Sequence, residues 1–206
     1  MKIMAITTNF GFGPVSKLKT IIDTIKQYNK DVIIDFYGNG ESVVFLKDDK
    51  NISNFIFVDP IKDAKFIAKK SNEYDLVINV MYVEILKYLS NTKAKIYFVD
   101  SLSFLWNEPF KYADVIDRYF VQNFVMDESN IKNMKVNYEI INPIVSNNIN
   151  NKSIDESLKN SLLVNFSGLH DPFKKRKFFI EFARIHLNLI TDLFKNDFDN
   201  IYISSN

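Results

Sequence analysis

The chain has 206 residues, of which 47% are hydrophobic and 25% charged, with 26 basic and 25 acidic side chains. The formal net charge of +1 provides no global field for nucleic acid or an anionic membrane surface. Cysteine is absent, which excludes disulfides, thiolate metal sites and cysteine nucleophiles. No run of about 18 apolar residues occurs, so we expect no transmembrane segment. The absence of cysteine is consistent with a cytoplasmic protein, and the balanced charge gives no reason to expect a nucleic-acid partner.

Short apolar runs alternate with amphipathic segments over the first 145 residues. Strands are predicted at 2–8, 31–37, 41–46, 54–58, 75–80, 95–100, 118–123 and 138–141. Helices are predicted at 15–28, 60–71, 82–89, 110–115 and 127–133. Strands that are apolar on both faces suit a parallel sheet covered by helices. We therefore predict an α/β domain over residues 1–145, with a Rossmann-like, doubly wound and mostly parallel sheet.

The composition changes after residue 145. Residues 146–160 are rich in Asn, Ser and Lys and are interpreted as a linker, although an ordinary surface loop has a similar composition. The pattern then restarts with a strand at 162–166, a helix at 172–194 and a strand at 200–203. Two strands and one helix cannot bury their own apolar faces. Residues 161–206 are therefore expected to be the start of a second, truncated Rossmann-like unit, or to pack on the first domain or on a second copy.

The stretch that follows the first predicted strand, residues 9–16, is the most informative. Gly11 and Gly13 allow a sharp turn and the close approach of a ligand, and Pro14 suits the first position of a helix. The N–H groups that open this helix favour an anion, and Ser16 is positioned to supplement them. A phosphate or other polar ligand is one interpretation, and a tight turn that serves only packing is the other.

The same stretch approximates the dinucleotide motif GxGxxG, with Ser16 in place of the third glycine. Asp35, on the second predicted strand, stands near the spacing of the carboxylate that binds a ribose. However, Asp35 is expected inside its strand and not at the strand's end. An NAD(P)-dependent oxidoreductase that uses Gly11, Gly13 and Asp35 is therefore one alternative function.

Residues 100–106 follow a predicted strand at the edge where open α/β sheets place ligand loops. Asp100 is interpreted either as an active-site carboxylate or as the cap of a turn. Ser101 and the single tryptophan, Trp106, are expected to line an acceptor pocket, although an aromatic side chain that covers the core is an equally good interpretation of Trp106.

A second strand-to-helix turn spans residues 165–173, with Ser167 and Gly168 at its start. His170, one of two histidines in the chain, is a candidate general base or phosphate ligand. A surface histidine without a task is the simpler interpretation. His186 lies within the predicted helix, where a structural role is expected.

Taken together, these stretches resemble the amino-terminal half of a GT-B-type glycosyltransferase. The resemblance rests on the glycine-rich loop after the first strand, the loop from Asp100 to Trp106, the closing strand before Pro143, and the strand that leads to Ser167 and Gly168. In that family two Rossmann-like domains face each other across a cleft, and the first holds the acceptor while the second holds the nucleotide sugar. The resemblance implies a nucleotide sugar as co-substrate, with no separate cofactor and no metal site.

The resemblance also implies roles for individual residues. Asp100 is the expected base, and the donor diphosphate is expected at Ser167, Gly168 and His170. The acceptor side is expected at Gly11, Phe12, Gly13, Ser16, Ser101 and Trp106.

Two departures from the family pattern matter. Many members carry a histidine base after the first strand, where this chain has Pro14 and no histidine before His170. The donor-ribose carboxylate of the family belongs to a part of the second domain beyond residue 206. The 206-residue chain alone is therefore expected to lack transferase activity. A non-catalytic α/β binding or assembly module, which forms homo-oligomers through residues 161–206, is the third interpretation.

Overall fold

The computed structural model describes the chain except for residues 10, 104–107, 124–135, 146–159, 166–175 and 205–206. It divides into two compact units, Met1–Asn147 and Asn148–Asn206, each with a sheet of its own. The helix predicted at 127–133 and most of the predicted linker lie outside the described residues.

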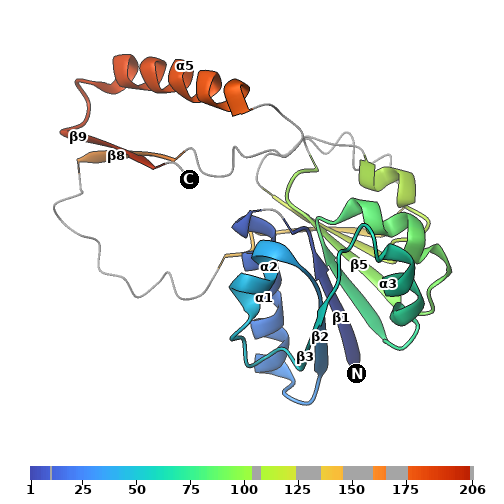
Figure 1. The fold of residues 1–206 in the computed structure, drawn as a ribbon. Coiled ribbons are helices and arrows are strands. Elements are labelled where there is room, and N and C mark those ends of the chain that lie inside the picture. The colour runs from blue at the N-terminus through green and yellow to red at the C-terminus, as the bar shows by residue number, and fades with distance from the viewer. Residues whose placement is uncertain (10, 104–107, 124–135, 146–159, 166–175, 205–206) are drawn as a thin grey trace. The chain divides into compact units, whose positions relative to one another are not determined.

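Unit 1 is built on a seven-stranded parallel sheet (Figure 1). In chain order the strands are β1 (Lys2–Thr7), β2 (Ile33–Gly38), β3 (Asn54–Phe57), β4 (Leu76–Val80), β5 (Lys95–Asp100), β6 (Arg118–Gln122) and β7 (Tyr138–Ile141). Their spatial order is β3-β2-β1-β4-β5-β6-β7, so the direction of winding reverses between β1 and β4. This confirms the Rossmann-like α/β fold predicted from the apolar strand pattern.

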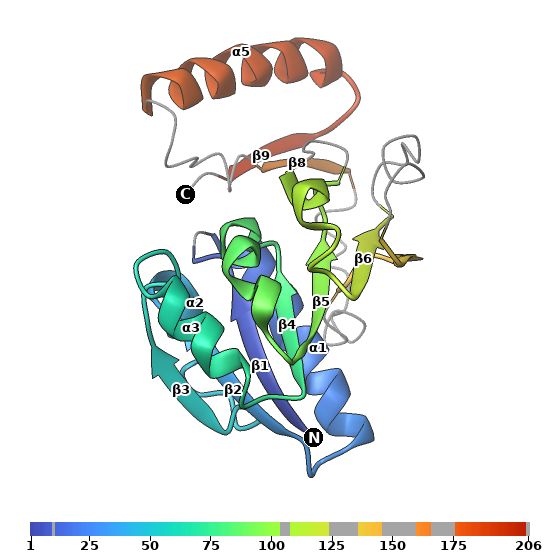
Figure 2. The same ribbon diagram turned by 90° about the vertical axis from the view of Figure 1, so that its right-hand side faces the viewer.

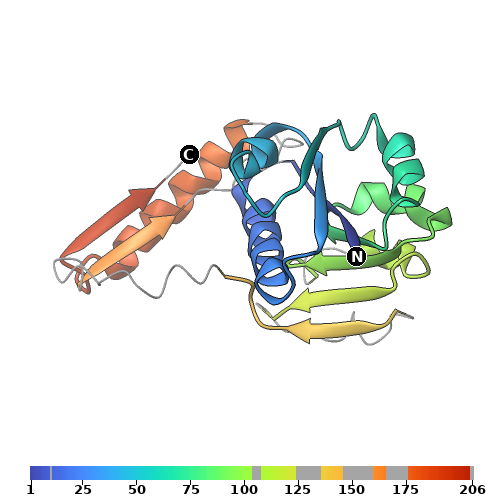
Figure 3. The same ribbon diagram turned by 90° about the horizontal axis from the view of Figure 1, so that it is seen from below.

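Helical segments cover both faces of the sheet. They are α1 (Phe12–Tyr28), α2 (Gly40–Leu46), α3 (Ala64–Ser71) and the 3-10 helices η1 (Val83–Asn91) and η2 (Glu108–Tyr112). Successive side chains of a strand point to opposite faces. In β1, Ile3 and Ala5 therefore belong to the core under α1 and α2, whereas Met4 and Ile6 belong to the core under α3 and η1. Figures 2 and 3 show α1 and α3 on opposite sides of the sheet.

The strand predicted at 41–46 is wrong, because these residues form α2. Neighbouring parallel strands need a crossover between them, and α2 provides it between β2 and β3. The buried residues of α2, Ser42 and Leu46, are four positions apart and share one face of the helix. An apolar run of this length does not by itself distinguish a strand from a buried helix.

The starts of two predicted helices also differ from the structure. Helix α1 begins at Phe12, after the N-cap Gly11, so Pro14 is its third residue and not its first. A proline is tolerated there because the first-turn N–H groups have no partner within the helix. Helix α3 begins at Ala64 and not near Pro60. The Asp59 carboxylate accepts the N–H groups of Ile61 and Lys62 at 3.0 and 3.1 Å, and this closes a separate turn before α3.

The α1 face of the sheet carries an open apolar groove of about 570 Å³. It is lined by Tyr97, Val99, Phe120 and Ile141 of the sheet and by Ile21 and Ile25 of α1, among others. Among the described residues, the lining includes no charged side chain. The groove is therefore an apolar surface without a carboxylate, lysine, arginine or histidine side chain among the described residues that line it.

Unit 2 contains β8 (Ser161–Asn165), α5 (Arg176–Phe194) and β9 (Asn200–Ser204). The two strands pair in parallel, from Ser161 opposite Asn200 to Asn165 opposite Ser204. The strand–helix–strand order predicted for this part of the chain is thus present, as a single βαβ element.

Candidate functional site

The candidate site lies at the edge of the sheet of unit 1 where the parallel strands end. Ligands of open α/β sheets bind at this edge, near the point where the strand order reverses. At this edge two further hydrogen bonds connect the end of β1 to the end of β4. Thr7 Oγ1 and the Thr8 N–H donate to the Val80 carbonyl at 3.2 and 3.4 Å. The glycine-rich loop follows β1 and the Asp100 loop follows β5, so the topology brings both predicted segments to the same edge.

The glycine-rich loop has a backbone that suits glycine. Gly11 adopts φ 68° and ψ 162°, a region that residues with a Cβ rarely enter. Its N–H donates to Glu41 Oε2 of α2 at 2.8 Å. The start of α1 therefore already faces a carboxylate from the same chain. The Ser16 hydroxyl, expected to supplement an anion site, donates to the Gly13 carbonyl at 2.9 Å.

Sequence reasoning missed Glu41. Its position became meaningful only when residues 40–46 were found to form a helix beside α1. The signal available was the acidic residue directly after Gly38, Asn39 and Gly40, since acidic side chains favour the first turn of a helix.

Lys17 brings a cationic side chain to the first turns of α1. Its Nζ lies 3.5 Å from the Gly13 carbonyl oxygen. Burial lowers the pKa of Lys17, because the charged ammonium loses hydration. Nothing in the sequence singles out Lys17, because a lysine on an amphipathic helix is expected to lie on its solvent-exposed face.

Met81, directly after β4, is the one described non-glycine residue with a positive φ, 60°. Strained backbone of this kind concentrates at functional sites. The Asn79 side chain holds the turn, donating to the Tyr82 carbonyl at 2.8 Å and accepting the Tyr82 N–H at 3.0 Å. Ser101 Oγ donates to Met81 Sδ at 2.9 Å, so this turn positions the loop after β5. The polar Asn79 within an apolar strand was the only sequence signal.

Asp100, the last residue of β5, is fully buried. Its Oδ2 accepts the Tyr119 hydroxyl at 2.5 Å, and its Oδ1 accepts the Leu102 N–H at 2.6 Å. Burial, followed by the nearby Asp100 carboxylate, raises the pKa of Tyr119. The geometry gives Asp100 the turn-capping contact expected in one of its two interpretations, and its role as a base stays a prediction.

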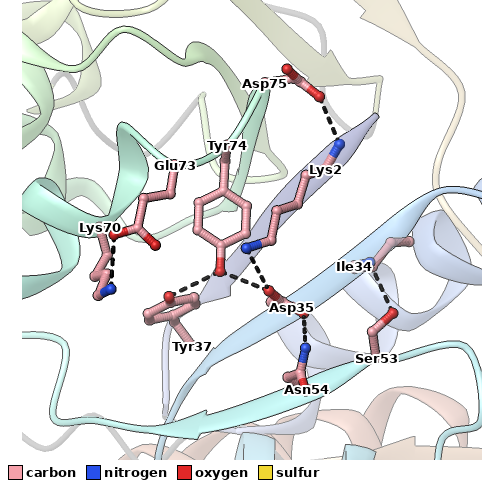
Figure 4. Close-up of polar contacts among 10 residues, drawn as sticks. All are labelled: Lys2, Ile34, Asp35, Tyr37, Ser53, Asn54, Lys70, Glu73, Tyr74 and Asp75. Carbon is pink, nitrogen blue, oxygen red and sulfur yellow. Dashed lines mark hydrogen bonds and ion pairs between the residues drawn. The ribbon is translucent and has the colours of Figure 1, made fainter.

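Asp35 lies within β2, as expected, and is 3% exposed. Figure 4 shows its contacts: Asn54 Nδ2 donates to Oδ1 at 2.7 Å, while the Tyr74 hydroxyl at 2.8 Å and Lys2 Nζ at 3.5 Å meet Oδ2. The hydroxyls of Tyr37 and Tyr74 lie 3.0 Å apart. Lys2 opens β1 and Tyr74 precedes β4, so this network is at the amino edge of the sheet. A ribose carboxylate belongs at the carboxyl edge, and the oxidoreductase interpretation is not favoured.

Several predicted site residues lie outside the described part of the chain: Trp106, Ser167, Gly168 and His170. Within the described ranges, no group of three or more His, Cys, Asp or Glu side chains is placed to hold a metal ion. No helix in these ranges has both the length and the apolar character needed to cross a membrane.

No family model matches the sequence, and no similar sequence was found among curated proteins. The chain is similar in structure to Anabaena Alr3699/HepE in complex with UDP and glucose, at 12% identity and a TM-score of 0.56, over 98% of this chain and 68% of that one. Weaker likenesses, both with a TM-score of 0.44 over 98% of this chain, are to E. coli ADP-heptose LPS heptosyltransferase II (14% identity) and to a family 9 glycosyl transferase from Veillonella parvula (12% identity).

The chain spans 64% of the length of the heptosyltransferase and 69% of that of the Veillonella protein. At these identities the likeness concerns the fold alone. At that level the likeness to HepE agrees with the Rossmann-like α/β fold expected from the sequence.

Proposed function

We propose that the protein is a GT-B-type glycosyltransferase, in which unit 1 holds the acceptor and unit 2 contributes to binding a nucleotide-sugar donor. The observation that carries this proposal is the similarity to a structure that contains UDP and glucose, which extends over 98% of the chain and therefore through both units. The doubly wound sheet supports it, because two segments lie at the ligand edge. One is the turn at Gly11 with the start of α1 at Phe12 and Gly13, and the other is the end of β5 at Asp100 with Ser101 after it.

The proposed reaction is the transfer of a sugar to an acceptor hydroxyl. The hydroxyl oxygen forms a bond to the anomeric carbon while the bond from that carbon to the donor diphosphate breaks. The electron pair leaves with the diphosphate, and the hydroxyl proton passes to a carboxylate, which we assign to Asp100. Ser167, Gly168 and His170 are assigned to binding the diphosphate. N–H groups and a cationic side chain stabilise the negative charge that develops on the diphosphate as it leaves.

Binding of the donor can be tested on the 206-residue chain by calorimetric titration and thermal unfolding with UDP, UDP-glucose and NAD. We expect UDP and UDP-glucose to stabilise the protein, by about 2.7 kcal/mol at a concentration of about 100 times Kd, and NAD to have no effect. The two histidines form a matched pair: His170→Ala should weaken UDP binding, whereas His186→Ala should not. Stabilisation by NAD alone, or by none of the three, would contradict the proposal.

The role of Asp100 requires a separate test, since its carboxylate is enclosed and bonded to Tyr119 and Leu102. Because the 206 residues alone are expected to lack transferase activity, the transfer assay uses a form of the protein that includes a complete donor half. In this assay Asp100→Asn should lower kcat by about 100-fold or more, the usual contribution of a general base. UDP affinity should remain unchanged. Tyr119→Phe, which leaves the carboxylate in place, is the control and should retain transfer within about 10-fold. Equal losses in both variants would assign Asp100 to the turn only.

A further inference from the structure

We propose that Phe12, Phe45 and Glu41 form a binding surface for a neutral saccharide ring, and that Glu41 makes this surface reject anionic sugars. The inference rests on the proposed function, since it names the chemical class of the acceptor. These three residues, together with Asn9 and Asn39, form the acceptor surface.

The aromatic part of the acceptor surface is exposed. Phe12, the first residue of α1, is 50% exposed, and Phe45 of α2 is 41% exposed. Their ring centroids lie 5.9 Å apart, with the ring planes tilted by 40°. The core-facing residues of these helices are others, among them Val15 and Leu46. Because burial in the core does not account for the two rings, they are available to a ligand at the edge where α/β sheets bind ligands.

The polar part lies next to the rings in sequence and in space. Glu41 Oε2 accepts the Gly11 N–H, directly before Phe12, and no hydrogen-bond partner of Oε1 is found among the described residues. Asn9 Nδ2 donates to Asn39 Oδ1 at 3.0 Å, and this contact is exposed. The surface therefore combines apolar ring faces with a carboxylate oxygen and two amides.

This combination matches the chemistry of a pyranose. A pyranose presents an apolar C–H face, which packs on aromatic rings, and hydroxyl groups at its rim, which pair with carboxylate and amide groups. A purely apolar protein surface would bury Glu41, Asn9 and Asn39 without partners, at a cost for each buried polar group. The observations therefore favour a saccharide over a protein partner.

The charge of Glu41 determines which saccharide fits. The N-terminus of α1 carries a partial positive charge that attracts anions, but the Glu41 carboxylate already occupies the Gly11 N–H. A second anion at this position would meet the Glu41 charge at short range. The surface therefore selects a neutral ring over a sugar acid or a sugar phosphate.

The test is an NMR titration of the ¹⁵N-labelled 206-residue chain that follows the amides of Gly11, Phe12 and Gly13. The probes are methyl β-D-glucopyranoside and its glucuronate analogue, sodium methyl β-D-glucuronate, which share the pyranose ring and the anomeric methyl group and differ in the charged carboxylate at C6. We expect saturable shifts with the glucoside at a Kd on the order of 1 mM, and at least about 10-fold weaker binding of glucuronate. Glu41→Gln should reduce this preference to less than about 3-fold.

Matched variants assign the surface. Phe12→Ala and Phe45→Ala should each weaken glucoside binding by about 5-fold or more. Phe66→Ala, which removes a 45% exposed phenylalanine of α3, should not change it. Unfolding midpoints confirm that each variant is folded. The inference would be overturned if Phe66→Ala weakened glucoside binding as much as Phe12→Ala, or if the wild type bound both sugars equally. It would also be overturned if Phe12→Ala changed only the oligomeric state measured by sedimentation and not the binding of the glucoside.

Failure here is distinguishable from failure of the proposed function, because the titration contains no nucleotide and needs no transfer. If UDP binds but neither sugar shifts the three amides, the acceptor surface is wrong and the glycosyltransferase proposal stands. If the glucoside binds as described but neither UDP nor UDP-glucose does, the proposed donor is wrong.

Discussion

Two buried aspartates toward opposite edges of the same sheet have similar surroundings but different partners. Asp35 in β2 is almost fully buried and Asp100 in β5 is fully buried. Each accepts a hydrogen bond from a tyrosine hydroxyl. Asp35 also meets the Lys2 ammonium and the Asn54 amide, all within or beside strands. Asp100 instead accepts the N–H of Leu102, in the loop that leaves the sheet.

The comparison teaches that burial and a tyrosine partner do not distinguish a carboxylate within the sheet from one that contacts a loop. Asp35 belongs to a network at the amino edge with Lys2, whose ammonium lies 4.3 Å from the centre of the Tyr74 ring. The network ties together β1, β2, β3 and Tyr74, which lies two residues before β4. Asp100 stands at the edge from which ligand loops emerge. The end of the strand at which a carboxylate lies is therefore more informative than how deeply it is buried.

The largest effect is expected at the amino edge. Asp35→Ala leaves the Lys2 ammonium and the Tyr74 and Asn54 donors without their acceptor, so we expect the free energy of unfolding to fall by about 3–4 kcal/mol in urea titrations. Asp48→Ala, at an exposed position, is the control and should stay within about 0.5 kcal/mol of the wild type. A change below about 1 kcal/mol at Asp35 would mean that the network contributes little to the fold.

The next effect separates two glycines at the carboxyl edge. Gly11→Ala forces a Cβ into a left-handed backbone, although the added atom has no neighbour within 4 Å, and should cost about 2 kcal/mol. Gly13 has a helical backbone without positive φ, and its Cβ would lie 3.8 Å from Lys17 Nζ. Gly13→Ala should therefore be neutral or stabilise by up to about 1 kcal/mol. Equal costs at both positions in urea unfolding would show that backbone conformation is not what requires Gly11.

The smallest effect concerns the two tyrosines and depends on pH. Burial first, and then hydrogen bonds with Tyr37 and Asp35, raise the pKa of Tyr74, while phenols of the unfolded chain ionise near pH 10. The stabilisation is therefore complete below about pH 10 and is lost as the pH rises further, because only the unfolded state then releases the proton.

Tyr74→Phe should accordingly lower the free energy of unfolding by about 1 kcal/mol at pH 7, and the difference from the wild type should shrink above about pH 10. Tyr119→Phe is the matched variant at the other edge and should behave alike. Urea titrations from about pH 7 to 11 check both. A difference that stays constant over this range would contradict the assigned cause.

Much of the architecture follows from the order of short apolar runs and amphipathic segments. Runs such as Lys95–Asp100 are short and apolar on both faces and recur between amphipathic segments, a pattern that favours a parallel sheet covered by helices, so the parallel α/β sheet was predictable. So was the position of Asp35 inside its strand. The run at 41–46 was not, because its apolar residues fit a strand and a buried helix equally well until β2 and β3 are known to be parallel neighbours that need a crossover.

Sequence by itself therefore determined the fold class and the glycine-rich turn at Gly11, since hydrophobic periodicity and backbone freedom are local properties. Only the tertiary structure decided that Glu41 meets the Gly11 N–H, that Met81 is strained beside Ser101, and that Asp35 and Asp100 lie at opposite edges. These contacts join residues far apart in the chain, and no local pattern encodes which strand ends meet. The net charge of +1 likewise gave no information on the local charge at the start of α1. The Glu41 carboxylate lies there, and the neutral saccharide that we propose as the ligand follows from its position.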